Sequence, residues 1–174
     1  YIQAFEINEG KQILPSTHLV INNNELIAGK DFFPLIFSGG GSKEAYASPV
    51  LSEKGMPWFL DLKDIIDTNR NNPEFDLEKA IKNKAEDFAK KGASDVFVYN
   101  TGAMDDGLEF DGKEKVEPLN IPVIYISKEA VKKYLNDKSA NYELNLNVAI
   151  GDKKTEGHNV VGYIDNGDAK TIIL

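Results

Sequence analysis

Residues 76–126 decide the fold, because they carry a helix, a strand, an acidic loop and a second strand in succession. The stretch opens DLEKAIKNKAEDFAKKGASDVFVYN (residues 76–100) and closes LNIPVIYI (residues 119–126). Asp76 is a suitable N-cap, since its carboxylate can accept the free N–H groups of a first helical turn. Gly92 suits the left-handed residue that ends many helices. Between them, apolar residues recur at helical spacing and predict one buried face: Leu77, Ala80, Ile81, Ala85, Phe88 and Ala89.

Two short runs after this helix predict strands that are covered on both faces. Val96–Tyr99 is apolar throughout, and residues 121–126 repeat the pattern. Pro122 lies near the start of the second run, where a missing N–H does least harm. Ser127 is a suitable N-cap for a second helix. The order of these elements predicts a mixed α/β fold.

The flanking segments predict further strands. Residues 1–7 alternate and predict a strand that residues 8–10 would end. Residues 17–21 and 25–27 flank an asparagine-rich turn and predict a hairpin. Residues 142–150 alternate most regularly, as in a strand with one face on the core. Residues 151–154 are expected to turn this strand into another at 159–164, and residues 165–168 predict a hairpin turn.

Three stretches between these elements are less regular. Residues 38–42 (SGGGS) lack the Gly-Lys-Ser/Thr of a phosphate-binding loop and predict a flexible turn. Trp58, in the apolar stretch 56–62, is expected in the core or at a domain contact. Residues 64–72 predict a short helix at most.

Composition excludes several functional classes. The 174 residues carry a formal charge of −8, with Arg70 as the only arginine. Such a chain repels phosphate backbones and anionic membrane surfaces, so we expect neither nucleic acid nor a membrane as a partner. There is no cysteine, which excludes thiol catalysis, disulfides and thiolate metal sites.

The loop at residues 102–114 is the most acidic part of the chain. Its carboxylates are the candidate site residues: Asp105, Asp106, Glu109 and Asp111. Oxygen ligands of this kind suit calcium, but their spacing does not match the helix–loop–helix calcium motif. A solvated loop is the simpler interpretation, and we predict no metal ligand in this chain.

Catalytic side chains are scarce. His18 and His158 are far apart in the sequence, and neither has a second histidine at metal-ligand spacing. The carboxylates lie in polar loops, where burial does not raise their pKa values. The sequence thus predicts a domain without catalytic residues, with a small carboxylate-based α/β enzyme as a minor alternative.

The order of motifs resembles the protease-associated (PA) domain. The resemblance rests on the lysine-rich helix that ends in Gly92-Ala93, the Val/Ile-rich strand, and the Ile-Pro-Val strand that leads into a helix. Residues 157–164 and 171–174 resemble the entry to the catalytic domain of secreted bacterial zinc aminopeptidases, which use two zinc ions. Residues 1–37 resemble the segment that leads into the PA insert of such enzymes.

This resemblance implies a swivelling β/β/α fold, with strand-rich, partly barrel-like sheets and two or three covering helices. It implies a PA-like domain with lead-in strands at residues 1–155 and the truncated start of a peptidase domain at residues 156–174. The family's zinc ligands and catalytic Glu have no matching positions here, so zinc is expected in the parent protein only. A secreted, periplasmic or cell-envelope location follows from the same resemblance.

Two functions are weighed on this basis. The first is a non-catalytic lid or substrate-access domain beside the parent's own peptidase domain, with residues 102–114 as a rim that meets peptides. The second is a stand-alone module that binds proteins or peptides, in one version dependent on calcium. A dimer through an exposed strand at residues 172–174 is also expected.

Overall fold

The computed structural model describes residues 2–160. In this part of the chain, the strands are β1 (Ile2–Ile13), β2 (His18–Ile21), β3 (Asn24–Leu26), β4 (Phe32–Pro34), β5 (Gly41–Ala47), β6 (Trp58–Asp61), β7 (Val96–Tyr99), β8 (Val123–Ile126), β9 (Tyr142–Val148) and β10 (Ile150–Val160). The helices are α1 (Lys63–Asn69), α2 (Leu77–Lys91) and α3 (Lys128–Tyr134). The fold is therefore mixed α/β and rich in strands, as predicted. No described helix is long and apolar enough to cross a membrane.

The central sheet has the order β4-β8-β7-β6, with β6, β7 and β8 parallel. Its two inner strands, β7 and β8, are buried on both faces, which confirms the interpretation of the two apolar runs. Alternate residues point to opposite sides. Phe97 and Ile124 pack against the second sheet and α3, whereas Val98 and Val123 pack in the cluster that includes α2. The central sheet is therefore the middle layer of three.

Helix α2 covers one face of this sheet, and its ends are those expected from the sequence. The Asp76 carboxylate accepts a hydrogen bond from the Lys79 N–H at 2.9 Å. Gly92 has a φ of +106° and ends the helix. Ile81 and Ala85 are the residues of α2 that are fully buried. Ser127 caps α3 in the same way.

The second sheet is antiparallel, with the order β3-β2-β9-β5. Asn22 and Asn23 have positive φ values in the turn between β2 and β3, which confirms the predicted hairpin. In β9, Tyr142, Leu144 and Leu146 are buried while the intervening residues are more exposed, as predicted. The second sheet and the helices α1 and α2 thus enclose the central sheet from opposite sides.

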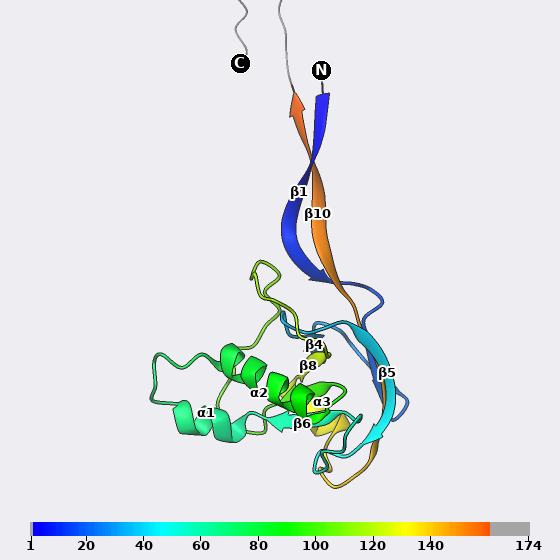
Figure 1. The fold of residues 1–174 in the computed structure, drawn as a ribbon, viewed down its shortest axis with the longest axis vertical. Helices are drawn as coiled ribbons and strands as arrows, with labels where there is room; N and C mark the ends of the chain where they lie inside the picture. Colours follow the sequence, from blue (N-terminus) through cyan, green and yellow to red (C-terminus); the bar gives the residue numbers. More distant parts are fainter. Residues whose placement is uncertain (1, 161–174) are drawn as a thin grey trace, which may run out of the picture.

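The strands β1 and β10 pair as a two-stranded ribbon, which projects from the rest of the chain in Figure 1. We call this pair the ribbon and residues 14–149 the body. Two sequence predictions are wrong here. Residues 8–10 do not end β1, which passes them through a bulge, and residues 151–154 do not turn the chain but lie within β10. The strand pairing over the whole ribbon overrides the local turn composition. The expectations for residues 161–174 lie outside the described residues.

Residues 38–42 are more ordered than the predicted flexible turn. The Ser38 hydroxyl is buried and accepts a hydrogen bond from the Val123 N–H at 2.8 Å. The Gly39 N–H donates to the Ile121 carbonyl at 3.0 Å, and a Cβ at Gly39 would overlap the Leu119 carbonyl. Gly41 then begins β5. The glycines here therefore permit close packing rather than mobility.

Candidate functional site

The acidic loop of residues 102–114 begins at the carboxyl edge of the parallel strands. Its Asp106 is half-buried and accepts hydrogen bonds from the Tyr125 hydroxyl at 2.8 and 3.0 Å. The buried Asn100 side chain donates to Asp106 at 2.8 Å and to the Met104 carbonyl at 3.0 Å. Burial raises the pKa of Tyr125, and the Asp106 carboxylate raises it further. Asp106 therefore attaches the start of the loop to β8.

A second polar group lies at the end of β6. The Asp61 carboxylate accepts hydrogen bonds from Lys138 at 2.8 Å and from the Thr101 hydroxyl at 2.6 Å. Burial acts to raise the pKa of Asp61, but the hydrogen bonds from Lys138 and Thr101 outweigh it and lower the pKa. This edge of a parallel sheet is where α/β proteins commonly bind ligands. Here the described polar groups are already paired with one another.

The other candidate carboxylates point to solvent. Asp105, Glu109 and Asp111 are exposed. The structure thus brings Asp106 against the core and leaves the other three on the outside of the loop. Among residues 2–160, no three His, Cys, Asp or Glu side chains are arranged to hold a metal ion.

The loop also approaches the first turn of α2. Burial raises the pKa of Glu78, and the neighbouring Glu114 carboxylate raises it further, with smaller contributions from Asp76 and Asp111. At neutral pH, the like charges oppose the approach of the loop to the helix.

The tip of the loop touches the ribbon. The Lys11 N–H donates to the Gly112 carbonyl at 2.6 Å. A Cβ at Gly112 would overlap the Lys11 carbonyl oxygen, and a Cβ at Gly10 would overlap the Gly112 carbonyl oxygen. Two glycines thus allow two backbones to meet at the bulge of β1.

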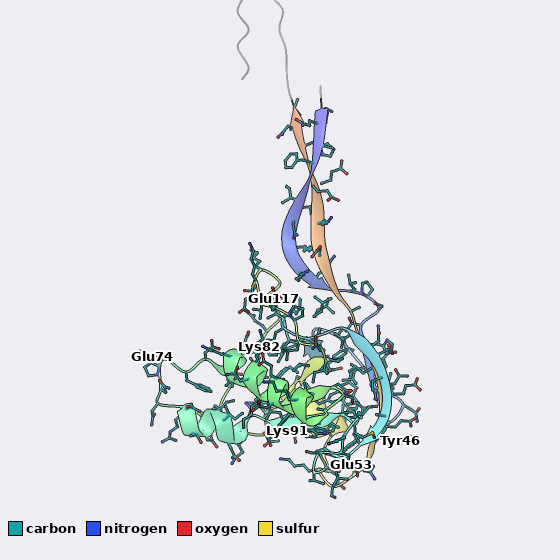
Figure 2. The ribbon with its side chains drawn as sticks, viewed as in Figure 1. Tyr46, Glu53, Glu74, Lys82, Lys91 and Glu117 are labelled. Atoms are coloured by element: carbon teal, nitrogen blue, oxygen red, sulfur yellow. The ribbon has the colours of Figure 1, made fainter. Side chains whose placement is uncertain are left out.

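A cleft of about 1390 Å³ lies beside this contact. The ribbon forms one wall, the loop from Gly112 to Pro118 forms another, and residues of the body form the floor. Figure 2 shows Glu117 of this loop close to the base of the ribbon. Apolar side chains line the floor and lower walls: Ile7, Ile36, Val116, Ala149 and Ile150. Charged side chains line the rim: Glu9, Lys11, Lys113, Glu114, Lys115, Glu117, Asp152 and Lys153.

Several rim charges are paired across the ribbon. Lys11 lies 2.7 Å from Asp152, and Lys153 lies 2.9 Å from Glu9. An apolar floor with charges of both signs at the rim suits a segment of polypeptide better than a small anion or a bare cation.

The two histidines, both among the described residues, are held by local partners. His18 lies in β2, with ring nitrogens 3.2 Å from the Ser16 carbonyl and from the Asn145 side chain. His158 lies on the ribbon, 2.9 Å from Glu156. Each histidine thus has a local partner, and neither joins a group of three metal-ligating side chains in the described part of the chain.

Sequence reasoning singled out the acidic loop but missed what it contacts. The sequence predicts Tyr125 as a strand residue and places Asn100 directly after a strand, and it assigns no role to Lys11 or Gly112. Their pairings join positions that are far apart in the sequence, so no local pattern signals them. The bulge of β1, which shapes the contact, is marked only by Gly10, which suggested the end of the strand instead.

Comparisons with known proteins give similarity of fold alone. No protein-family model and no curated protein sequence matches the chain. A zinc aminopeptidase from Bacillus subtilis, BSAP, has a similar structure, with a TM-score of 0.50 and 14% sequence identity over 98% of this chain. An aminopeptidase from Aneurinibacillus sp. strain AM-1 gives 0.47 and 18% over 98%, and a peptidase M28 precursor from Shewanella amazonensis SB2B gives 0.43 and 13% over 94%.

This chain spans only 38–41% of the length of those proteins. The similarity to the Bacillus subtilis protein therefore relates the fold of residues 2–160 to one part of a larger structure.

Proposed function

We propose that this chain is a non-catalytic accessory domain of the PA type that belongs to a zinc-dependent aminopeptidase. Its body would act as a lid or substrate-access domain beside the peptidase domain. The zinc ions and the catalytic residues would belong to that other domain, outside the described residues. The boundary at residues 155/156 and a secreted or cell-envelope location are part of this proposal.

The pairing of β1 with β10 is the observation that carries it. Ile13 and Ile150 are direct partners in the ribbon, so the chain enters and leaves the body at neighbouring positions. The body is thus an excursion from a continuous two-stranded ribbon, which is the connection expected of a domain inserted into another domain. An insertion of this kind can add a lid without interrupting the host fold.

The fold comparison supports the same interpretation. Nearly the whole of this chain matches about two fifths of a zinc aminopeptidase, which leaves most of that protein for other functions. The cleft lies beside the ribbon, and residues 112–114 of the acidic loop line it. A peptide on its way to a site beyond the ribbon would meet this cleft first. The exposed Asp105, Glu109 and Asp111 would favour peptides with a free amino group or basic side chains.

Excision of the body tests the proposal. In the full-length natural protein, residues 14–149 are replaced by Asn-Gly, which can close a two-residue hairpin between the paired Ile13 and Ile150. We expect zinc content and the kcat/KM for an aminoacyl p-nitroanilide to stay within about twofold. For peptides of increasing length, we expect kcat/KM to change by about fivefold or more, which corresponds to about 1 kcal/mol in transition-state binding.

A matched variant with Asp105→Asn, Glu109→Gln and Asp111→Asn keeps the body and removes three charges. It should alter the preference between basic and neutral peptides without altering zinc content. Loss of zinc in the excised protein would contradict the proposal, because the body would then be part of the catalytic fold. An unchanged preference across all peptide lengths would favour the alternative of a module that binds a separate protein partner.

A further inference from the structure

In the described part of the chain, the ribbon is held at its root and at one further contact. At the root, where Ile13 and Ile150 continue into the body, the Leu14 N–H donates to the Ala149 carbonyl at 2.9 Å and holds the two chain segments together. The Thr17 hydroxyl donates to the same carbonyl at 2.9 Å and accepts from the Ala149 N–H at 3.0 Å. The second contact is between Lys11 and Gly112, three residues further along β1.

The root alone does not fix the direction of the ribbon. Two-stranded ribbons are weakly stabilised and bend easily when no third layer covers them. The rise per residue places the second contact about 10 Å along the strand from the root. Two separated contacts restrict the angle of the ribbon, whereas the root alone would let it pivot. We call the second contact the brace. Figure 1 shows the loop that leads to β8 rising from the body toward the base of the ribbon, and the brace forms where this loop, which follows β7, meets the ribbon.

The brace is built from backbone atoms that only glycine can bring together. Gly112 has no side chain between its own backbone and that of Lys11, and Gly10 has none between β1 and the Gly112 carbonyl. The bulge of β1 falls at these residues and directs the Lys11 N–H at the loop. Near the contact, burial raises the pKa of Glu78 and the Glu114 and Asp111 carboxylates of the loop raise it further, so like charges weaken the seat of the loop on α2.

The brace also borders the cleft. The two walls of the cleft are the ribbon and the loop, and they meet where Lys11 touches Gly112. Release of this contact would let the walls separate, whereas its formation holds them at a set distance.

We propose that Gly112 is a releasable brace that sets the angle between the ribbon and the body and thereby the opening of the cleft. It forms when the loop seats its Gly112 carbonyl on the Lys11 N–H. It releases when the loop moves away while the root stays in place. The inference concerns residues 2–160 only, and it holds whether or not the chain belongs to a peptidase.

A pair of spin labels measures the angle. The sequence has no cysteine, so Glu156→Cys on the ribbon and Lys84→Cys on α2 provide the only labelling positions. Both side chains that they replace lie at the surface. We expect one narrow distance distribution in the otherwise unaltered chain. Amide hydrogen exchange at Lys11, followed by NMR, reports the brace itself.

Gly112→Ala is the decisive variant, because its methyl group would overlap the Lys11 carbonyl. Gly107→Ala is the matched control in the same loop, since a Cβ there meets nothing within 4 Å, although its φ of +64° makes it the more strained backbone. In Gly112→Ala, we expect a broadened or shifted distance distribution and about tenfold faster amide exchange at Lys11. In Gly107→Ala, we expect neither change. An unchanged distribution in Gly112→Ala would overturn the proposal.

A second pair of variants approaches the contact from the ribbon. Lys11→Pro removes the N–H that is directed at the loop, and proline is tolerated at such positions of edge strands. Lys11→Gln is its control, because it loses the ion pair with Asp152 but keeps the N–H. The distribution should broaden with Lys11→Pro and not with Lys11→Gln. If Gly112→Ala also unfolds the body, as fast exchange in β7 would reveal, this pair decides the outcome in either direction.

Discussion

The short strands of the body and the long strands of the ribbon differ in what stabilises them. β7 and β8 have four residues each, and every one of these residues is buried. β1 and β10 have 12 and 11 residues, yet nearly all of them are exposed or half-buried. Exposed apolar side chains remain on the ribbon, with Phe5 43% and Ile7 42% exposed.

The contrast teaches that strand length and stability are separate properties here. A ribbon gains backbone hydrogen bonds, each of which contributes about 0.5–1.5 kcal/mol net, while its backbone loses entropy of similar size per residue. Burial adds about 25 cal/mol per Å² of apolar area, and β7 and β8 receive it on both faces. We therefore expect the body to unfold as one cooperative unit and the ribbon to open at lower free energy.

The largest effect should follow truncation in the central sheet. Phe97 is fully buried and stacks on Phe59 with 5.3 Å between ring centroids. Phe97→Ala should lower the free energy of unfolding by about 3–5 kcal/mol, because it leaves a cavity between two layers. Urea denaturation followed by circular dichroism measures the loss. If Phe97→Ala lowered the free energy of unfolding as little as a ribbon variant does, burial would not distinguish the body from the ribbon.

The next effect concerns the one buried carboxyl of the described core. Asp95 is 1% exposed, and its Oδ1 has no hydrogen-bond partner among the described residues. Burial raises the pKa of Asp95, although the Ser94 hydroxyl and Lys43 oppose the shift. The folded state therefore holds this proton more tightly than the unfolded state. Stability is fully present below the unfolded pKa and is lost as pH rises through the folded pKa, by up to about 1.4 kcal/mol per pH unit.

Asp95→Asn should abolish this dependence. Unfolding free energies of the two proteins, measured in urea from about pH 4 to about pH 8, should diverge as pH rises, with the variant the more stable at the upper end. Parallel curves would mean that Asp95 stays ionised in the folded state and has a partner that the hydrogen bonds described above do not include.

A smaller effect is expected at the start of α2. Asp76→Ala removes the carboxylate that accepts from the Lys79 N–H and should cost about 1 kcal/mol. Asp76→Asn is the matched control, because an amide oxygen can accept the same hydrogen bond. Thermal unfolding of both variants separates the contribution of the capping hydrogen bond from that of the negative charge. An equal loss in the two would assign the effect to electrostatics at the helix end.

The smallest effect should come from the ribbon. Phe5 covers Gly157 on the opposite strand but remains largely in solvent. Phe5→Ala should change the global free energy of unfolding by less than about 0.5 kcal/mol. Amide exchange along β10 should nevertheless become faster, since the ribbon opens independently of the body. A global loss near that of Phe97→Ala would show that the two regions unfold together.

Local patterns predicted the body well for physical reasons. The α2 helix is buried on one face, and β7 and β8 are buried on both. Each therefore has a recognisable pattern of apolar residues in the sequence. The hairpin of β2 and β3 has turn residues with positive φ, and asparagine signals these reliably. In each case the information lies within about 15 residues.

The ribbon and the cleft depend on distant pairing instead. Gly151 and Asp152 have the composition of a turn, but they pair with Gln12 and Lys11 in an extended strand. Asp106 was selected for its charge, whereas its contacts with Tyr125 and Asn100 follow from how the loop crosses the sheet edge. In the sequence, nothing marks the contact between Gly10 and Gly112 except the two glycines themselves. No period or motif in a single sequence encodes such contacts.

The pairing of Ile2 with Val160 and of Ile13 with Ile150 has a mechanical consequence. A load applied to the outer ends of β1 and β10 acts perpendicular to the strands, along their hydrogen bonds. The hydrogen bonds therefore break one pair at a time, from the outer end inward. The ribbon should therefore open at low force while the body remains folded. An optical-tweezers experiment should record a gradual lengthening before any abrupt rupture. A single rupture at high force would mean that the load reaches the core directly.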